Sequence, residues 1–249
     1  MMLEPTIDEL SIYRDITNLG VRLWEISTNI EGLSTDPKMF SIMLYKRLWS
    51  NHRGYTALYN LHLSLEANII LRSAVETAIC IAANYRLRDD FVLLMKKDAC
   101  HTIQGQIKIH RENGATDTVK EGEATLRYLQ SFLPEGVKAA KLDWKSLAEH
   151  GGVDQLYGFH RLLSGVSSHV TGLSILRGVT NGKMDAQHAE LGGLERKMHL
   201  MMMAGAMLQG SRIHSGMIEA YAELDQAVAL TERLATISME WPGAIEGEG

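Results

Sequence analysis

Apolar residues recur at helical spacing along most of the chain. In the first segment they follow one another at intervals of three and four residues: Ile12, Ile16, Leu19, Leu23, Ile26 and Ile30. This spacing places the side chains on one face of a helix. Thr6 and Glu9 form a capping-box pattern ahead of the stripe, so the first helix is predicted to begin there and to end before Gly32.

Helix starts and breakers divide the next part of the chain. Asp36 and Pro37 supply an N-cap and a first-turn proline for a second helix, which residues 51–54 are expected to interrupt or kink. A third helix is predicted from about residue 55 to 88, and a fourth from residue 89 until the Asn113–Gly114 stop. These two helices are expected to form a helical hairpin.

Two more helices are predicted in the middle of the chain. Thr118 and Glu121 form a second capping-box pattern, and Pro134 with Gly136 ends the helix that follows it. A short helix is expected around residues 144–150 and ends at two glycines.

A long helix is predicted from Asp154 to about Arg177. Its apolar stripe is Leu162, Val166, Leu173 and Leu176. Three glycines recur every seven residues along another line and predict a close helix contact: Gly158, Gly165 and Gly172. After the turn at residues 181–182, two final helices are predicted before Pro242, and the methionines of residues 198–207 are read as core or as an oligomer face.

Composition supports an all-α fold. With 45% hydrophobic residues but only 6% aromatic residues and 4 prolines, the chain is typical of helices rather than sheets. We therefore predict a single helical-bundle domain of about seven to nine antiparallel helices over residues 1–242, with residues 243–249 as a disordered tail.

The net charge and the number of cysteines indicate which partners and which cellular compartment to expect. The formal net charge of -5 offers no basic footprint for DNA. Cys80 and Cys100 are too few for a disulfide framework, which fits a reducing compartment. Residues 1–8 lack a basic and apolar targeting pattern, and the most apolar run, residues 200–208, is too short to cross a bilayer. We expect a cytoplasmic protein that does not bind membranes.

The third helix carries one polar stripe on an otherwise apolar surface, formed by Asn68, Arg72 and Glu76 at intervals of four residues. One reading is a solvent edge with a surface ion pair. The other is a buried pair that fixes the Arg72 guanidinium for an anionic ligand or a structural network. Glu ahead of Arg would favour an isolated helix more than the observed order does, which weighs mildly against the first reading.

The helix of residues 154–177 carries the second polar feature. Tyr157, Arg161, Ser164 and Ser168 share one stripe, whereas His169 falls in register with the apolar stripe. His169 is either a hydrogen-bonded core histidine or a general base beside Arg161 or Arg72.

Sequence motifs for metals, cofactors and nucleophiles are absent. The chain contains no Glu-x-x-His, HExxH or paired CxxC pattern, and no P-loop, G-x-G-x-x-G or G-x-S-x-G. We expect neither a metal nor a cofactor.

At its two polar helices the chain resembles a bacterial family of all-helical proteins of unknown function. The resemblance covers about residues 55–176 and rests on Arg72-x-x-x-Glu76 followed by Tyr157, Ser164 and His169. More remotely, the chain is similar to the HEPN superfamily, many members of which are metal-independent ribonucleases of toxin and phage-defence systems with an Arg-x(4–6)-His motif near a dimer interface. The present chain departs from that motif, because seven residues separate Arg161 from His169.

Two classes of function follow. In the first, Arg72, Glu76, Tyr157 and His169, with Ser164 and Ser168 nearby, bind a small anionic or nucleotide-like ligand, or His169 and Arg161 cleave RNA in a homodimer. In the second, the polar cluster is structural, and the protein acts by oligomerising or by holding a partner. Whether the chain is an enzyme is left open by its sequence.

Overall fold

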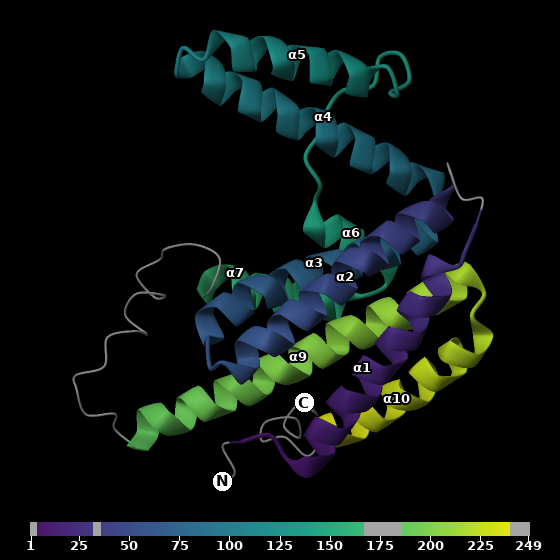
Figure 1. Cartoon of the computed structure of the whole chain (residues 1–249), viewed down its shortest axis with the longest axis vertical. Coiled ribbons are helices and arrows are strands. Elements are labelled where there is room, and N and C mark those ends of the chain that lie inside the picture. The colour runs from purple at the N-terminus through teal and green to yellow at the C-terminus, as the bar shows by residue number, and fades with distance from the viewer. Residues whose placement is uncertain (1–3, 32–35, 167–185, 240–249) are drawn as a thin grey trace, which may run out of the picture.

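The structure is a computed structural model that describes residues 4–31, 36–166 and 186–239 (Figure 1). Within these ranges it is all-helical, as predicted, with nine helices and no strand. The helices are α1 (Ile7–Thr28), α2 (Pro37–Asn60), α3 (Ser64–Leu87), α4 (Asp89–Glu112), α5 (Thr116–Gln130), α6 (Trp144–Gly151), α7 (Asp154–Val166), α9 (Ala186–Ile218) and α10 (Tyr221–Met239).

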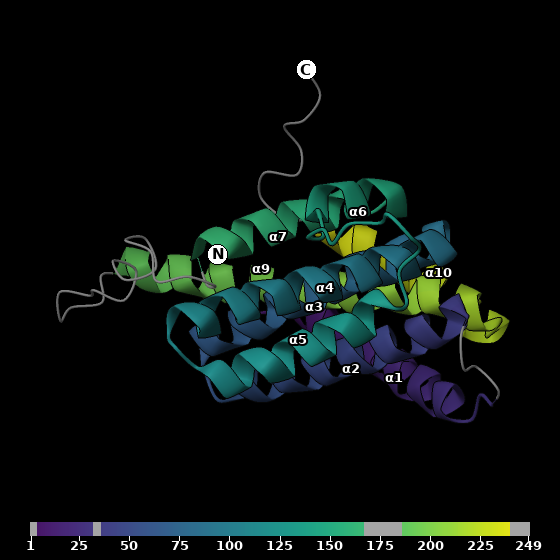
Figure 2. The same ribbon diagram turned by 90° about the horizontal axis from the view of Figure 1, so that it is seen from above.

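The helix α3 lies at the centre of the bundle. It is buried along most of its length between Ala67 and Asn84. On one side α2 packs against it, on another α6 and α7 cover it, and α9 also packs against it (Figure 2). The helix α9 in turn contacts α1, α2 and α10. Its methionines are part of this core, as predicted, because Met201, Met202, Met203 and Met207 are buried.

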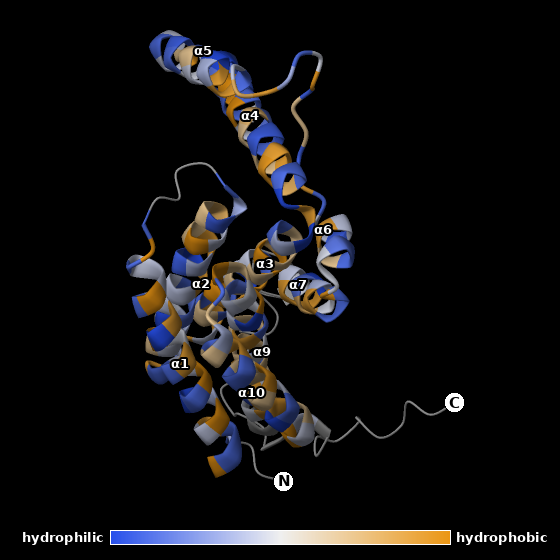
Figure 3. Ribbon diagram, turned by 90° about the vertical axis from the view of Figure 1, so that its right-hand side faces the viewer, coloured by the Kyte–Doolittle hydropathy of each residue, from blue (hydrophilic) through white to orange (hydrophobic). Residues whose placement is uncertain are grey.

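The helices α4 and α5 form a hairpin that projects from the bundle (Figures 1 and 3). The predicted hairpin of the third and fourth helices is wrong, because α4 packs mainly against α5 and contacts α3 little. The chain turns at Arg88, whose positive φ of 53° ends α3 and starts α4 in a new direction. The second helix of the hairpin, α5, has no buried residue.

Local capping signals were read correctly at several helix ends. The Thr6 hydroxyl accepts a hydrogen bond from the Glu9 backbone N–H, and the Glu9 carboxylate accepts one from Thr6 N–H at 2.7 Å. Asp36 accepts hydrogen bonds from the first turn of α2. Gly152, at a φ of 66°, ends α6 where two glycines were expected to do so.

The predicted interruption at residues 51–54 is wrong, because α2 continues to Asn60 and the chain turns at Leu61 and His62. Packing explains the difference. His52 is buried, and its Nε2 lies 2.9 Å from the Thr17 hydroxyl of α1. A glycine in a helix costs only about 1 kcal/mol, which such contacts outweigh.

The second predicted capping box is also wrong. The helix α5 begins at Thr116, two residues ahead of Thr118, and no side chain caps it. The Gly114 turn, with a φ of 72°, leads directly into this helix, and the Ala115 N–H bonds back to the His110 carbonyl. The start of α5 is therefore fixed by the preceding turn.

The predicted glycine contact is wrong as well. A Cβ added at Gly158 or Gly165 would meet no atom of the described residues within 4 Å, and Gly172 lies outside those residues. The close approach is instead at Gly151, where an added Cβ would lie 2.7 Å from the Ala82 Cβ and 3.1 Å from the α3 backbone. Gly151 thus brings the end of α6 against α3.

Among the described residues, no helix combines the length and apolar character that crossing a bilayer requires. The hydropathy colouring agrees with this, since blue and orange residues alternate along the helices (Figure 3).

Candidate functional site

The polar stripe of α3 is half-buried rather than a solvent edge. Arg72 Nε lies 3.1 Å from Glu76 Oε1, and the two side chains are only 22% and 23% exposed. Asn68, one turn earlier, is buried. This favours the second of the two readings of the stripe, in which the pair is shielded from solvent.

The group that reaches this pair from α7 is His160. Its Nε2 lies 3.2 Å from Glu76 Oε1, and the residue is 7% exposed. Since a carboxylate accepts hydrogen bonds, the imidazole carries its proton on Nε2, and this N–H donates a hydrogen bond to Glu76. Glu76 therefore receives both the guanidinium of its own helix and the imidazole of α7.

Sequence reasoning missed His160 because it set the phase of α7 incorrectly. Leu162, which was placed on the core stripe, is 43% exposed, whereas Leu156 and Leu163 are fully buried. His160 lies four residues after the first and three before the second, so it shares their face. This spacing was the available signal.

Two aromatic rings enclose the imidazole. The Trp144 ring centroid lies 5.6 Å from that of His160, and the Tyr157 ring is stacked on the imidazole at 6.0 Å. Tyr157 therefore lies next to Arg72 and Glu76 through its ring contact with His160, while His169, the other predicted member of this cluster, lies outside the described residues. We call Arg72, Glu76, Trp144, Tyr157 and His160 the α3–α7 cluster.

The imidazole of His160 is neutral at pH 7. Burial lowers its pKa, and this effect outweighs the attraction of the Glu76 carboxylate, while Arg72 lowers the pKa further. With the proton on Nε2, the buried Nδ1 holds the lone pair, and it has no hydrogen-bond partner among the described residues. The cluster thus contains a carboxylate, a guanidinium and a neutral base.

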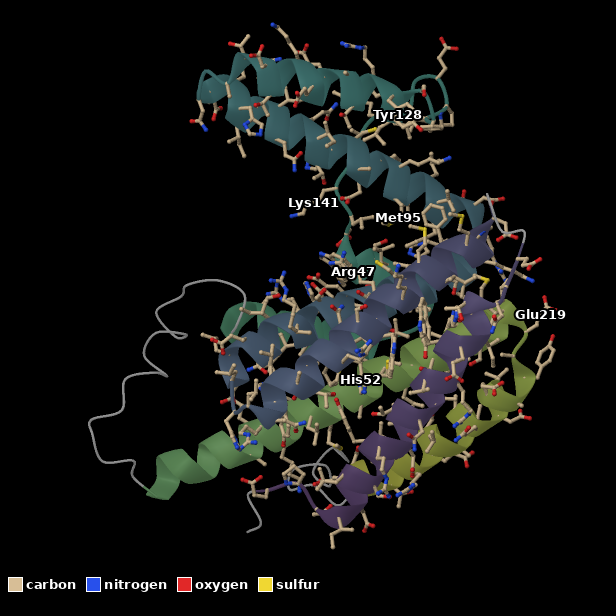
Figure 4. The ribbon with its side chains drawn as sticks, viewed as in Figure 1. Arg47, His52, Met95, Tyr128, Lys141 and Glu219 are labelled. Atoms are coloured by element: carbon tan, nitrogen blue, oxygen red, sulfur yellow. The ribbon has the colours of Figure 1, made fainter. Side chains whose placement is uncertain are left out.

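A pocket of about 210 Å³ adjoins Glu76, where the hairpin joins the bundle. It is built from α2, α3, α4, α6 and the segment before α6. Figure 4 shows Arg47 and Met95 at this junction, from α2 and α4. The lining residues, which we call the Glu76 pocket, are Leu44, Arg47, Ser73, Glu76, Thr77, Cys80, Met95, Asp98, Leu142 and Trp144.

Charges of both signs face this pocket. Arg47 is exposed, and within the described part of the chain its guanidinium makes a single long hydrogen bond, 3.4 Å to the Ser73 hydroxyl. Asp98 accepts a hydrogen bond of 3.0 Å from the Leu142 N–H, which ties the returning segment to α4. The Asp98 carboxylate keeps further acceptor positions. The pocket therefore presents one cation and two carboxylates.

The thiol in this pocket is not a nucleophile. Burial raises the pKa of Cys80 to about 12, and the nearby Glu76 carboxylate adds to the increase. Since the thiolate is the reactive form, Cys80 is inert at neutral pH. Both Cys80 and Cys100 are buried and free of disulfides.

Of the other predicted site residues, the structure describes Arg161 and Ser164, both on α7. Arg161 is exposed on α7. The Ser164 hydroxyl donates to the His160 carbonyl at 2.6 Å. Ser168 and His169 lie outside the described residues, so the Arg161–His169 pair of the ribonuclease hypothesis stays a prediction. No group of three metal-binding side chains occurs in the described ranges.

Two other histidines are buried as structural links. His214 Nε2 and Nδ1 lie 2.8 Å and 2.7 Å from the hydroxyls of Ser27 and Ser41, which connects α9 to α1 and α2. Its ring stacks on Tyr45 at 4.2 Å. Burial lowers the pKa of His214 to about 3 and that of His52 to about 4. Both rings are therefore neutral at pH 7.

Comparisons with protein-family models, with curated proteins and with solved structures found no significant match to this chain. The resemblances stated from the sequence thus stay expectations, and the function is argued from the site itself.

Proposed function

We propose that the protein binds a small polar metabolite that carries both an anionic and a cationic group, with a free amino acid as the simplest example. The Glu76 pocket is the site. The observation that carries this proposal is the pairing of a weakly bonded guanidinium, that of Arg47, with two carboxylates, those of Glu76 and Asp98, around one cavity. Such a lining is complementary to a zwitterion.

Each charge of the ligand has a matching group. A guanidinium binds a carboxylate through two parallel N–H donors, so the anionic end fits Arg47. Asp98 and Glu76 accept hydrogen bonds from an ammonium group. Glu76 is held in place by Arg72 and His160, at 3.1 Å and 3.2 Å, which fixes one wall of the pocket before the ligand arrives.

The cavity size selects a small ligand. Its volume of about 210 Å³ is below the usual range of about 300–1,000 Å³ for pockets that hold drug-sized molecules. This favours a ligand of amino-acid size over a nucleotide. The proposal is one of binding without catalysis. It agrees with the state of the two nearby reactive groups, since the Cys80 thiol is protonated and His160 Nδ1 is buried.

Calorimetric titration of the twenty amino acids, one at a time, tests the proposal. For the tightest binder, we expect its amide, which lacks the anion, and its N-acetyl form, which lacks the cation, each to bind at least about tenfold more weakly. Equal affinity of all three forms, or no saturable binding by any amino acid, would contradict the proposal.

A second candidate is the interaction module considered from the sequence. It is favoured by the projecting hairpin, on which Tyr128 and Phe132 are 65% and 46% exposed and pack edge to face at 4.9 Å. Light scattering during gel filtration tests whether this surface forms a homodimer. A dimer that becomes a monomer in the Tyr128→Ser, Phe132→Ser double variant would support the interaction function, and a wild-type monomer would count against self-association.

A further inference from the structure

A second and larger cavity lies between α7, α9 and α10. Its volume is about 570 Å³. We call it the α9 groove, and its lining residues are Gln155, Phe159, Met198, Met201, Met202, Gly205, Leu208, Gln209, Thr231, Leu234, Ala235 and Ser238. The groove is open to solvent, since Ala235 and Ser238 on its α10 side are exposed, and its volume lies within the usual range of about 300–1,000 Å³ for small-ligand pockets.

The residues of α9 and α10 keep the groove open. Close packing does not require a glycine at position 205. A Cβ there would lie 3.9 Å from the Phe159 ring, which is an ordinary van der Waals contact. By contrast, a Cβ at Gly20 or Gly151 would collide with neighbouring atoms. Glycine weakens a helix relative to alanine, and the missing side chain at Gly205 adds space to the groove. Opposite it, α10 presents the small residues Ala235 and Ser238.

The lining is uncharged, and its polar groups are few. The Thr231 and Ser238 hydroxyls donate to carbonyls of their own helix, at 2.8 Å and 2.9 Å. The Gln209 side-chain oxygen accepts a hydrogen bond from Arg212 at 3.0 Å, which leaves its amide nitrogen as a donor. Gln155 adds an exposed amide at the edge. A charged ligand would find no counter-ion among these groups and would lose hydration.

We propose that the α9 groove binds one neutral, mostly apolar small molecule with a hydroxyl or amide group at one end. At about 30 Å³ for each water-sized unit, the groove holds roughly twenty non-hydrogen atoms. The methionines Met198, Met201 and Met202 suit such a ligand, because their flexible thioether chains adapt to irregular shapes. The absence of charge distinguishes this site from the Glu76 pocket, on which it does not depend.

Fluorescence titration with Nile red, an uncharged apolar dye, tests the proposal on the full chain. We expect saturable binding of one dye per chain, and displacement of the dye by 1-decanol. Decanoate and decylammonium have the same alkyl chain with a charged end, and each should compete at least about tenfold more weakly. Equal competition by all three would overturn the assignment of a neutral ligand.

Substitutions inside the groove, each with a control on the same helix, test whether the dye binds there. Gly205→Leu and Ala235→Leu place a branched side chain in the groove from α9 and α10, and each should weaken dye binding at least about tenfold. Gly192→Leu and Ala229→Leu are the controls, because these residues are exposed on the same two helices and do not line the groove. The controls should bind the dye as wild type does. Since Ala235 is exposed, its variant keeps the test valid if Gly205→Leu fails to fold.

Other occupants of the groove give different outcomes, each of which overturns the proposal. Unchanged dye binding in both groove variants would place the dye elsewhere. A wild-type dimer that becomes a monomer in Ala235→Leu would mean that a second copy fills the groove. Dye binding that arises only after Trp241 and Ile245 are both changed to Gly would mean that the chain's own last residues fill it.

Discussion

His160 Nε2 lies 3.2 Å from Glu76 Oε1, and this contact joins α7 to the central helix α3. The imidazole donates a hydrogen bond to a carboxylate that Arg72 also binds, so one oxygen atom of Glu76 contacts two side chains, one from its own helix and one from α7. The same carboxylate forms a wall of the Glu76 pocket. The stability of the α3–α7 cluster and ligand binding are therefore linked through Glu76.

The first prediction concerns this link. His160→Ala removes a hydrogen bond to a charged group and opens space between Trp144 and Tyr157, so we expect a loss of about 2–3 kcal/mol in the free energy of unfolding. Urea unfolding measures it. His101→Ala, at an exposed position of α4, is the control and should change stability by less than about 0.5 kcal/mol. Equal losses of unfolding free energy in the two variants would show that the contact of His160 with Glu76 does not stabilise the fold.

The second prediction concerns pH. His214 and His52 have pKa values of about 3 and 4 in the folded chain, below the ordinary value of 6.5. The unfolded chain therefore binds more protons below pH 6.5, and stability is lost as the pH falls from there. Each histidine contributes a slope of up to about 1.4 kcal/mol per pH unit.

Urea unfolding at pH 7, 6 and 5 measures this slope. The window lies above the range in which carboxylates take up most of their protons, so the histidines dominate. In His214→Asn the slope between pH 6 and pH 5 should be smaller than in wild type. An unchanged slope would mean that His214 is protonated in the folded chain.

The third prediction concerns glycines. Gly151→Ala places a Cβ against Ala82 and the α3 backbone, and we expect it to cost about 1–3 kcal/mol. Gly158→Ala meets open space within an exposed part of α7 and should stabilise the chain by about 0.5–1 kcal/mol. Thermal melting of the two variants checks the order. A more stable Gly151→Ala variant would show that α6 does not approach α3 so closely.

The fourth prediction separates binding from the ribonuclease hypothesis. If the protein is a binding protein, wild type, Arg161→Ala and His169→Ala should give the same background cleavage of single-stranded RNA in EDTA. Wild-type cleavage that both substitutions abolish, without a change in melting temperature, would support a metal-independent nuclease instead.

The parts of the fold that the sequence predicted correctly are set by neighbouring residues. The Thr6–Glu9 capping box, the Asp36 N-cap and the Gly152 stop depend on contacts within a few residues, so they can be read locally. The boundary between α2 and α3 was mispredicted because it depends on His52, which packs against Thr17 of α1, 35 residues earlier in the chain and outside its own helix.

The candidate site was only partly predictable, because it too depends on contacts between different helices. Arg72 and Glu76 stood out, because a polar stripe on an apolar helix is visible in the sequence. His160 was missed through an error of one residue in helix phase. Arg47 and Asp98 carry no sequence signal, since the Glu76 pocket exists only where α2, α4 and the segment before α6 meet α3.

The affinity of Arg47→Ala for the tightest-binding amino acid, measured by calorimetry, tests the central claim most directly. Arg53→Ala is the matched control, because Arg53 is an exposed arginine of the same helix and lies outside the pocket. We predict that Arg47→Ala binds at least about tenfold more weakly than wild type, while Arg53→Ala binds equally well. Equal affinities of the two variants would contradict the assignment of the Glu76 pocket as the binding site.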